Sequence, residues 1–258
     1  MINTIKLIAC GGAAYTWRLG LVIGILALSL SSRLHAQDSD PGYQLWLEYN
    51  MDVLNGSLWK VDTEFDFKQD LDEWREFTFN PMAEFYYLRH LDILAGATFA
   101  FTNQTDTLDS FEFRPTLGIR YNFTPEKRFF FRIRIQYEYR IFTYFPEKVH
   151  DTSNRLRLRF ELRTSLTTND YHSPRNVYLI TDVEFFNNLQ EPAERYMYRD
   201  RISLGVGYKY SPRWTFSAVL IRQGSKNTID GSFSDNLDYI TEFQVSYRPE
   251  GHKKNEKE

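Results

Sequence analysis

The sequence predicts an all-β protein, a transmembrane antiparallel up-and-down β-barrel of about 10–12 strands with a charged lumen. Three observations predict this fold class. The stretch NRLRLRFELRT at 154–164 alternates charged and apolar residues, and a period of two is that of a β-strand, whose successive side chains point to opposite faces. Such alternation recurs in segments of about ten to fifteen residues, whereas strands of soluble domains typically have ~5–6 and a tilted membrane-crossing strand needs ~9–11. The third observation is an N-terminal export signal.

The first 36 residues have the features of a secretory signal peptide. They begin with MINTIK, continue to the apolar run LGLVIGILALSL at 19–30, and end on the small Ala36, so we expect cleavage between Ala36 and Gln37. The alternative is a retained membrane anchor, but the run is shorter than the ~20 residues that a spanning helix needs. We therefore divide the chain into a signal peptide at 1–36, a barrel at 37–248 and a polar disordered tail at 249–258.

Composition excludes several classes of site. Cys10 is the only cysteine, and because it leaves with the predicted signal peptide, the mature chain would have no disulfide, thiolate metal site or cysteine nucleophile. The net charge is −3, and no charge asymmetry points to nucleic acid. With 21 Phe, 17 Tyr and 25% charged residues, the chain must sort aromatic and charged side chains onto separate surfaces.

Eleven segments are predicted to be strands, and no amphipathic helix of useful length interrupts them. They cover residues 43–53, 57–68, 74–88, 92–102, 110–123, 129–142, 154–166, 176–186, 196–210, 213–222 and 238–247. In almost every one, one face is charged and the other is aliphatic in the middle and aromatic at the ends, as on the lipid side of an outer-membrane barrel. The reverse orientation would put several Arg per strand into lipid, at ~2–4 kcal/mol each near the midplane. The competing fold is a soluble β-sandwich, which would expose the charged rows to water.

Short and long connections alternate along the chain. The short ones are 89–91, 124–128 and 211–212, and the long polar ones are 103–109, 143–153, 187–195 and 223–237. Barrels place short turns in the periplasm and long loops outside, so we expect the long connections to be outer loops. Single-chain bacterial barrels have even strand numbers. Because eleven is odd, we expect one of two corrections. Either segment 43–53 lies outside the barrel, which gives ten strands, or one segment contains two strands, which gives twelve.

The last segment ends DYITEFQVSY, in which Phe243, Val245 and Tyr247 alternate toward a terminal aromatic residue. It resembles the C-terminal strand by which outer-membrane proteins are recognised for insertion. We therefore expect outer-membrane lipid and the barrel-insertion machinery as partners of a monomeric protein.

Charged residues that are predicted to face the lumen form the candidate site. The predicted network consists of Glu112, Arg114, Arg120, Arg132, Arg134, Glu138, Arg140, Arg155, Arg157, Arg159, Glu161, Arg163, Arg199 and Arg201. Further carboxylates in the same rows are Asp62, Glu64, Asp66, Glu76, Glu84, Asp182, Glu184 and Glu242. Opposite charges should pair across strands at ~0.2–1 kcal/mol per contact, and long side chains can largely fill a barrel of about ten strands. The alternative is an open, narrow channel in which clustered Arg favours a small anionic solute.

Catalytic and metal-binding motifs are missing from the sequence, including HExxH, GxSxG and any paired ligand spacing. His90, His150 and His172 fall in predicted turns or loops, and His150 near Ser153 is the only crude candidate for a base and a nucleophile. We therefore expect no enzyme, no cofactor and no metal. The alternative is an outer-membrane hydrolase of the lipase or esterase kind, acting at the extracellular loops.

Two stretches carry a resemblance to a known family, SNRLRLRFELR at 153–163 and YRDRISLGVGYKYSPRW at 198–214. Together with the signal peptide, they resemble the bacterial family of domain of unknown function 2490. The resemblance covers essentially the whole predicted mature chain. It implies a Gram-negative outer-membrane β-barrel of a kind common in Bacteroidota, with no assigned activity and no catalytic residue to carry over. We expect a structural role or a narrow small-solute channel in the cell outer membrane.

Overall fold

The computed structural model describes residues 42–70, 74–88, 90–104, 109–124, 128–146, 148–189, 196–227 and 234–249. The described residues form eleven strands: β1 (Gly42–Asn55), β2 (Trp59–Asp70), β3 (Trp74–Leu88), β4 (Leu91–Gln104), β5 (Ser110–Asn122), β6 (Phe129–Tyr144), β7 (Val149–Ser165), β8 (Asn176–Asn188), β9 (Tyr196–Lys209), β10 (Trp214–Asn227) and β11 (Ser234–Tyr247). The predicted signal peptide at 1–36 and residues 250–258 of the predicted tail lie outside this part of the chain. Within the described ranges, no helix combines the length and the apolar character needed to cross a membrane.

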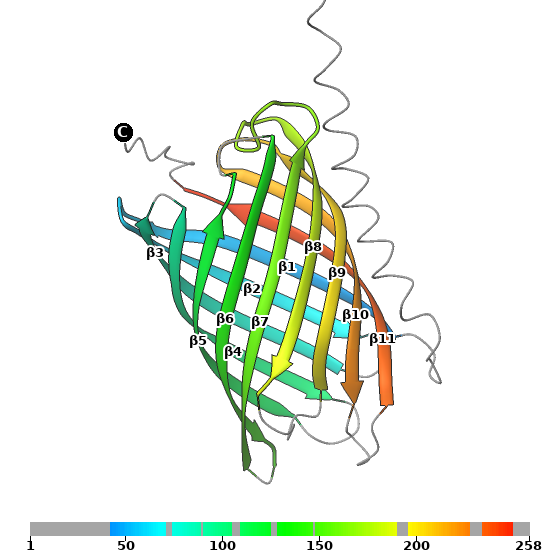
Figure 1. The fold of residues 1–258 in the computed structure, drawn as a ribbon. Helices are drawn as coiled ribbons and strands as arrows, with labels where there is room; N and C mark the ends of the chain where they lie inside the picture. The colour runs from blue at the N-terminus through cyan, green and yellow to red at the C-terminus, as the bar shows by residue number, and fades with distance from the viewer. Residues whose placement is uncertain are drawn as a thin grey trace, which may run out of the picture. The chain divides into compact units, whose positions relative to one another are not determined.

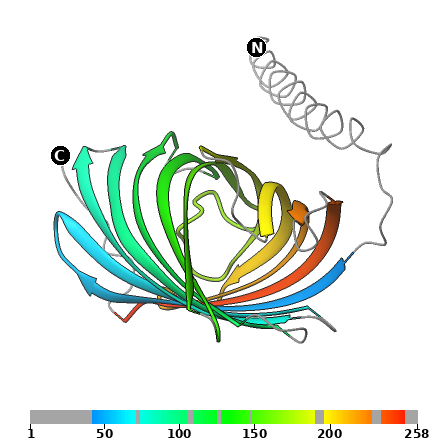
Figure 2. The same ribbon diagram turned by 90° about the horizontal axis from the view of Figure 1, so that it is seen from below.

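The strands close into one barrel in which each strand pairs with its neighbours in the sequence (Figure 1 and Figure 2). All consecutive strands are antiparallel. The barrel closes between β1 and β11, which pair in parallel from Gly42 opposite Asp238 to Met51 opposite Tyr247. The predicted all-β barrel is thus confirmed, but the expectation of wholly antiparallel pairing is wrong.

The number of strands explains the parallel closure. When an odd number of strands alternates in direction, the first and the last run the same way, so β1 and β11 can only pair in parallel. The expectation of ten or twelve strands is therefore wrong. The segment at 43–53 belongs to a full barrel strand, β1, and each of the other ten segments forms one strand rather than two.

Several connections are shorter than the sequence predicts. β6 continues to Tyr144 and β7 begins at Val149, so most of the predicted outer loop at 143–153 is strand. β10 and β11 shorten the predicted loop at 223–237 in the same way, ending at Asn227 and resuming at Ser234. These segments were predicted as loops because both of their faces are polar. Strand pairing continues there, since water can solvate either face of a strand.

Alternation along the strands divides the side chains into an inward and an outward set. The main apolar cluster of buried residues lies on the inward faces of β1, β8, β10 and β11 and consists of Trp46, Tyr178, Ile180, Val219, Ile221 and Ile240. The remaining inward positions are mostly polar or charged, so the candidate site lies inside the barrel.

Candidate functional site

The barrel carries its charged side chains inward and its large apolar side chains outward. Glu138, Glu161 and Arg155 are only 1–2% exposed, whereas the outward-facing Leu117 and Leu220 are 62% and 65% exposed. In a water-soluble protein, Glu and Arg are almost never fully buried and large apolar side chains are mostly inside. The polarity of this barrel is therefore inverted.

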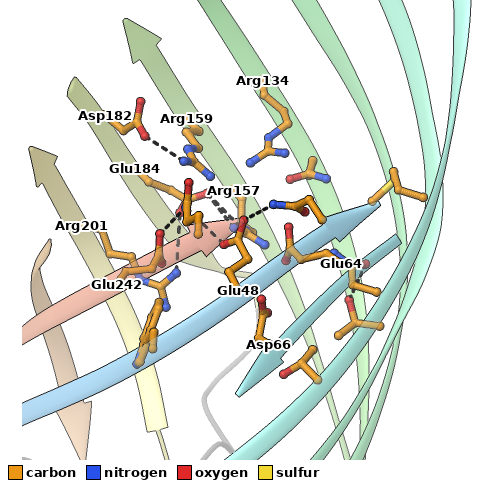
Figure 3. A pocket seen from close by; sticks show the side chains of 18 of the residues that line it. Glu48, Glu64, Asp66, Arg134, Arg157, Arg159, Asp182, Glu184, Arg201 and Glu242 are labelled. Atoms are coloured by element: carbon orange, nitrogen blue, oxygen red, sulfur yellow. Dashed lines mark hydrogen bonds and ion pairs between the residues drawn. The ribbon is translucent and has the colours of Figure 1, made fainter. Parts of the chain in front are cut away.

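The inward side chains surround a cavity of about 420 Å³, part of which is shown in Figure 3. On β6, its lining extends from Arg132 to Tyr144, which corresponds to roughly 40 Å along the tilted strand at ~3.4 Å per residue. Among the described residues that line the cavity, fourteen are basic and twelve are acidic. The lumen is thus densely charged but nearly balanced in sign.

Most residues of the predicted network meet in this cavity. Its lining includes Glu112, Arg114, Arg120, Arg132, Arg134, Glu138, Arg140, Arg155, Arg157, Arg159, Arg163 and Arg201. It also includes the further carboxylates Asp62, Glu64, Asp66, Glu76, Glu84, Asp182, Glu184 and Glu242. Glu161 is 1% exposed and accepts a hydrogen bond from Arg132. The backbone of Arg199 belongs to β9, but its side chain lies outside the described residues.

The most deeply buried ion pair joins β6 to β7. Arg155 Nη2 lies 2.6 Å from Glu138 Oε2, and the two side chains are 2% and 1% exposed. Arg157 Nη1 approaches the other oxygen of Glu138 at 2.7 Å, and its Nη2 lies 2.8 Å from Glu184 on β8. These arginines therefore connect three adjacent strands inside the lumen.

A second ion-pair group joins β3, β4 and β5. Arg120 donates two hydrogen bonds to Glu84, at 2.9 and 2.6 Å, and its Nε donates to Asp92 at 3.0 Å. Asn122 also donates to Asp92, at 2.8 Å. This fork geometry is the strong, charge-assisted form of the arginine–carboxylate interaction.

Two further carboxylates each hold several arginines. Glu112 lies between Arg114 and Arg140, at 2.6 and 2.7 Å. Asp182 accepts hydrogen bonds from Arg159, at 2.9 Å, and from Arg163. Most arginines of β5, β6 and β7 are thus neutralised locally by carboxylates on the same or a neighbouring strand.

The two signs of charge are unevenly distributed around the lumen. We define the acidic wall as the inward carboxylates of β1 and β2, namely Glu48, Asp52, Asp62, Glu64 and Asp66. The basic wall is the inward arginines of β6 and β7, namely Arg132, Arg134, Arg140, Arg155, Arg157, Arg159 and Arg163. In the closed strand order, β2 is five strands from β7 in one direction and six in the other, so the two walls face each other. Beside the local ion pairs, the lumen therefore has an excess of carboxylates on one side and of arginines on the other.

The cavity lining also includes residues outside the network that the sequence predicts, namely Trp46, Glu48, Asp52 and Tyr171. The first three lie on β1, the segment that an even strand count could exclude from the barrel. Their alternation with the outward Leu45, Leu47 and Tyr49 was the signal that could have identified them. Tyr171 lies in a connection, where no periodicity identifies inward residues.

The longest connection, residues 166–175 between β7 and β8, folds inward. Tyr171 stacks on Phe130 with ring centroids 5.1 Å apart, and Lys209 Nζ lies 3.6 Å from the centroid of the Tyr171 ring. Asn176 donates a hydrogen bond to the carbonyl oxygen of Tyr171 at 3.1 Å. In the view along the barrel in Figure 2, this connection lies within the ring of strands. Tyr171 therefore narrows the lumen near the end at which β7 meets β8.

The histidines do not form a catalytic arrangement with the predicted nucleophile. His90 and His172 lie in connections as predicted, but His150 is a strand residue of β7, which corrects its assignment to a loop. His150 is exposed, with Nδ1 3.0 Å from Thr143 Oγ1, whereas Ser153 is 2% exposed. Three residues apart on one strand, the two side chains point to opposite faces. The pair that suggested a hydrolase is therefore separated by the barrel wall.

Aromatic side chains form a continuous row across the outer face of five strands. Tyr49, Phe65, Phe79, Phe99 and Phe113 occupy directly paired positions on β1 to β5. Neighbouring rings in the row have centroids 5.0–6.4 Å apart. Such cross-strand aromatic pairs stabilise a sheet beyond the burial of their area.

These observations define the class of protein as a closed β-barrel with a charged interior and an apolar exterior. The chain belongs to the family described as protein of unknown function (DUF2490), whose model matches residues 43–234. The resemblance found in the sequence is thereby confirmed, and the family description assigns no activity. A search of the curated proteins found no match to the chain.

Proposed function

We propose that the protein is a monomeric β-barrel of the Gram-negative outer membrane, exported with a cleaved signal peptide, whose lumen is a narrow path for small solutes. The observation that carries this proposal is the inverted polarity of the barrel. The outward Leu117, Leu204 and Leu220 are 56–65% exposed, and burying such a side chain is worth ~1.5–3 kcal/mol. Lipid around the barrel would supply that burial on every side.

Strand length supports the same proposal. The shortest strand, β2, has 12 residues and the longest, β7, has 17, so each exceeds the ~9–11 residues of a tilted membrane-crossing strand. The closed order of strands leaves no free sheet edge that would need a partner. We infer that a single copy is sufficient to span the bilayer.

The interior supports a path for solutes rather than a catalytic site. Its cavity is lined along most of the length of β6, and its charges keep the lining wettable. His150 is exposed on the outer face, away from the buried Ser153. We therefore propose a role without catalysis, with purely structural support of the membrane as the second candidate.

The C-terminal strand supports export to this membrane. Phe243 on β11 points outward and is 49% exposed, and β11 ends on Tyr247. We propose that this alternating aromatic pattern is the feature that the barrel-insertion machinery binds.

The test begins with migration of the detergent-purified protein on a gel with and without boiling. We expect a heat-dependent shift, because a closed barrel resists detergent until it is heated. A protein that stays soluble and folded in plain buffer without detergent would contradict membrane insertion.

Single-channel recording in planar bilayers then tests the path. We expect small, steady conductance that increases in a Tyr171→Ala variant, because Tyr171 narrows the lumen. The matched control is Tyr121→Ala, which removes an outward ring that is 43% exposed and should leave conductance unchanged. Insertion without any conductance in either variant would reject the path and favour the structural role.

A further inference from the structure

Three carboxylates of the acidic wall meet at one point of the lumen. Glu48 on β1 lies directly opposite Asp66 on β2, and together with Glu64 they place one oxygen each within 4.8 Å of one another. Figure 3 shows all three side chains pointing into the pocket, with Glu242 of β11 beside them. Like charges at this separation repel, and a positive group placed among them would relieve that repulsion.

In the described part of the chain, two members of this cluster have no basic partner, and the third shares one. Among the described residues, Glu48 and Glu64 form no ion pair; Glu48 accepts hydrogen bonds only from the amides of Asn50 and, at 3.3 Å, Gln244. Asp66 is 7% exposed, and its buried Oδ1 has no hydrogen-bond partner. Its Oδ2 is 3.7 Å from Lys68 Nζ, but that ammonium lies closer to Glu76, at 2.9 Å. Asp66 is therefore a buried carboxylate with an unused oxygen.

The facing basic wall contains a matching unsatisfied cation. The nearest carboxylate oxygen to Arg134 is that of Glu161, with Nε 3.9 Å from Oε1, and this Nε is buried without a hydrogen-bond acceptor. The other oxygen of Glu161 lies 2.5 Å from Arg132 Nη2. Figure 3 shows the guanidinium of Arg134 pointing into the same pocket as Glu48 and Glu64. Its planar fork is thus available to a carboxylate or phosphate.

We propose that the lumen contains a binding site for a small zwitterionic solute, with its ammonium group at Glu48, Glu64 and Asp66 and its anionic group at Arg134. An ammonium has three donors, which matches three carboxylates that meet at one point. This site rests on the proposed function, because it names the class of solute that the lumen takes. It differs from a simple anion site, since the arginines around Arg134 are already held by carboxylates.

The test is calorimetric titration of the full-length protein in detergent, after the gel shift has shown that each sample is folded. The probes are glycine, 4-aminobutyrate and 6-aminohexanoate, which separate ammonium and carboxylate by increasing lengths. Butylammonium and butyrate carry one charge each. We expect one of the zwitterions to bind at least about tenfold more tightly than either single-charge probe, because only it reaches both walls.

Two variants separate the halves of the site. Glu64→Gln and Arg134→Gln should each weaken binding of the zwitterion at least about tenfold. The matched control is Asp52→Asn, which removes a lumen carboxylate that is 3.4 Å from Lys60 and should leave binding unchanged. If one of the two variants does not fold, the other still tests the proposal.

Three results would overturn this inference. Equal binding of butylammonium with no effect of Arg134→Gln would indicate a cation site alone. Binding of calcium by itself at the three carboxylates, with no zwitterion bound, would indicate a metal site. No heat with any zwitterion at two well-separated temperatures would mean that no such site exists, because a binding enthalpy near zero at one temperature changes with temperature. Because binding is measured in detergent, a barrel that conducts but binds no probe rejects only this inference, whereas failure to insert rejects the proposed function.

Discussion

The ring of Tyr178 lies directly over the backbone of Gly207, its paired residue on the neighbouring strand β9. A Cβ atom on Gly207 would come within 2.1 Å of Tyr178 Cζ. The ring is 4% exposed and packs edge-on against Tyr171, with centroids 5.0 Å apart. A glycine at this position thus lets a large inward ring lie flat against the barrel wall and support the inward-folded connection at 166–175.

Replacement of Gly207 should therefore destabilise the barrel. In Gly207→Ala, the methyl group would force the Tyr178 ring away from the wall, and overpacking of this kind costs ~1–3 kcal/mol. We expect urea unfolding of the detergent-refolded protein to show this loss in the free energy of unfolding. In a Tyr178→Ala background, the methyl group added by Gly207→Ala meets no ring. The double variant should therefore be nearly as stable as Tyr178→Ala alone. An equal cost of Gly207→Ala in both backgrounds would contradict the contact.

The buried pair Glu138 and Arg155 should be highly sensitive to removal of one partner. Glu138→Leu leaves Arg155, which is 2% exposed, with an uncompensated charge, and such a change typically costs 3–5 kcal/mol, here about 4 kcal/mol. The free energy of unfolding measures this loss. The double variant Glu138→Leu with Arg155→Met replaces both charges by apolar groups, and we expect it to regain most of the stability. A double variant as unstable as the single one would mean that Glu138 acts mainly through Arg157.

The parallel closure can be tested by a disulfide across the junction of the two ends of the sheet. Leu45 on β1 lies directly opposite Thr241 on β11, so cysteines at these positions, in a Cys10→Ser background, should form a disulfide on mild oxidation. The control places the second cysteine at Val245, which faces outward about 13 Å farther along the strand. The two cysteines of this control variant should remain reduced. A barrel that closes between β2 and β11, with β1 outside, would give no disulfide in the first variant.

Local alternation was sufficient to predict the strands and their faces. The bounds of β3, 74–88, agree with the structure, and Arg157 and Glu138 both lie in the lumen as their rows require. The alternation of charged and apolar residues involves only residues that are close in the sequence, so it can be recognised in a single sequence without knowledge of the fold. The segment at 149–153 was missed because its two faces differ little in polarity.

The choice of ion-pair partners in the lumen and the pairing that closes the barrel depend on contacts between distant residues, which alternation along one strand does not encode. Whether Glu138 holds Arg155 or another arginine is decided by the register between β6 and β7. The pairing of β1 with β11 joins opposite ends of the described chain, and the even-number rule for bacterial barrels gave the wrong count. The opposition of the acidic and basic walls follows only from that closure. The inward position of Tyr171 depends on packing against Phe130, which no pattern in 166–175 predicts.

The outer face gives the most direct test of lipid contact. Leu117 lies near the middle of β5 and is 62% exposed; if lipid surrounds it, Leu117→Arg should cost ~2–4 kcal/mol in vesicles. Leu54, 52% exposed near the end of β1, is the matched control, because Arg near the interface costs only ~0–1 kcal/mol. Unfolding in lipid vesicles measures the loss in the free energy of unfolding for both variants, Leu117→Arg and Leu54→Arg. On a barrel surrounded by water, each exposed substitution should stay within about 0.5 kcal/mol, so two small and equal effects would contradict a position within the bilayer.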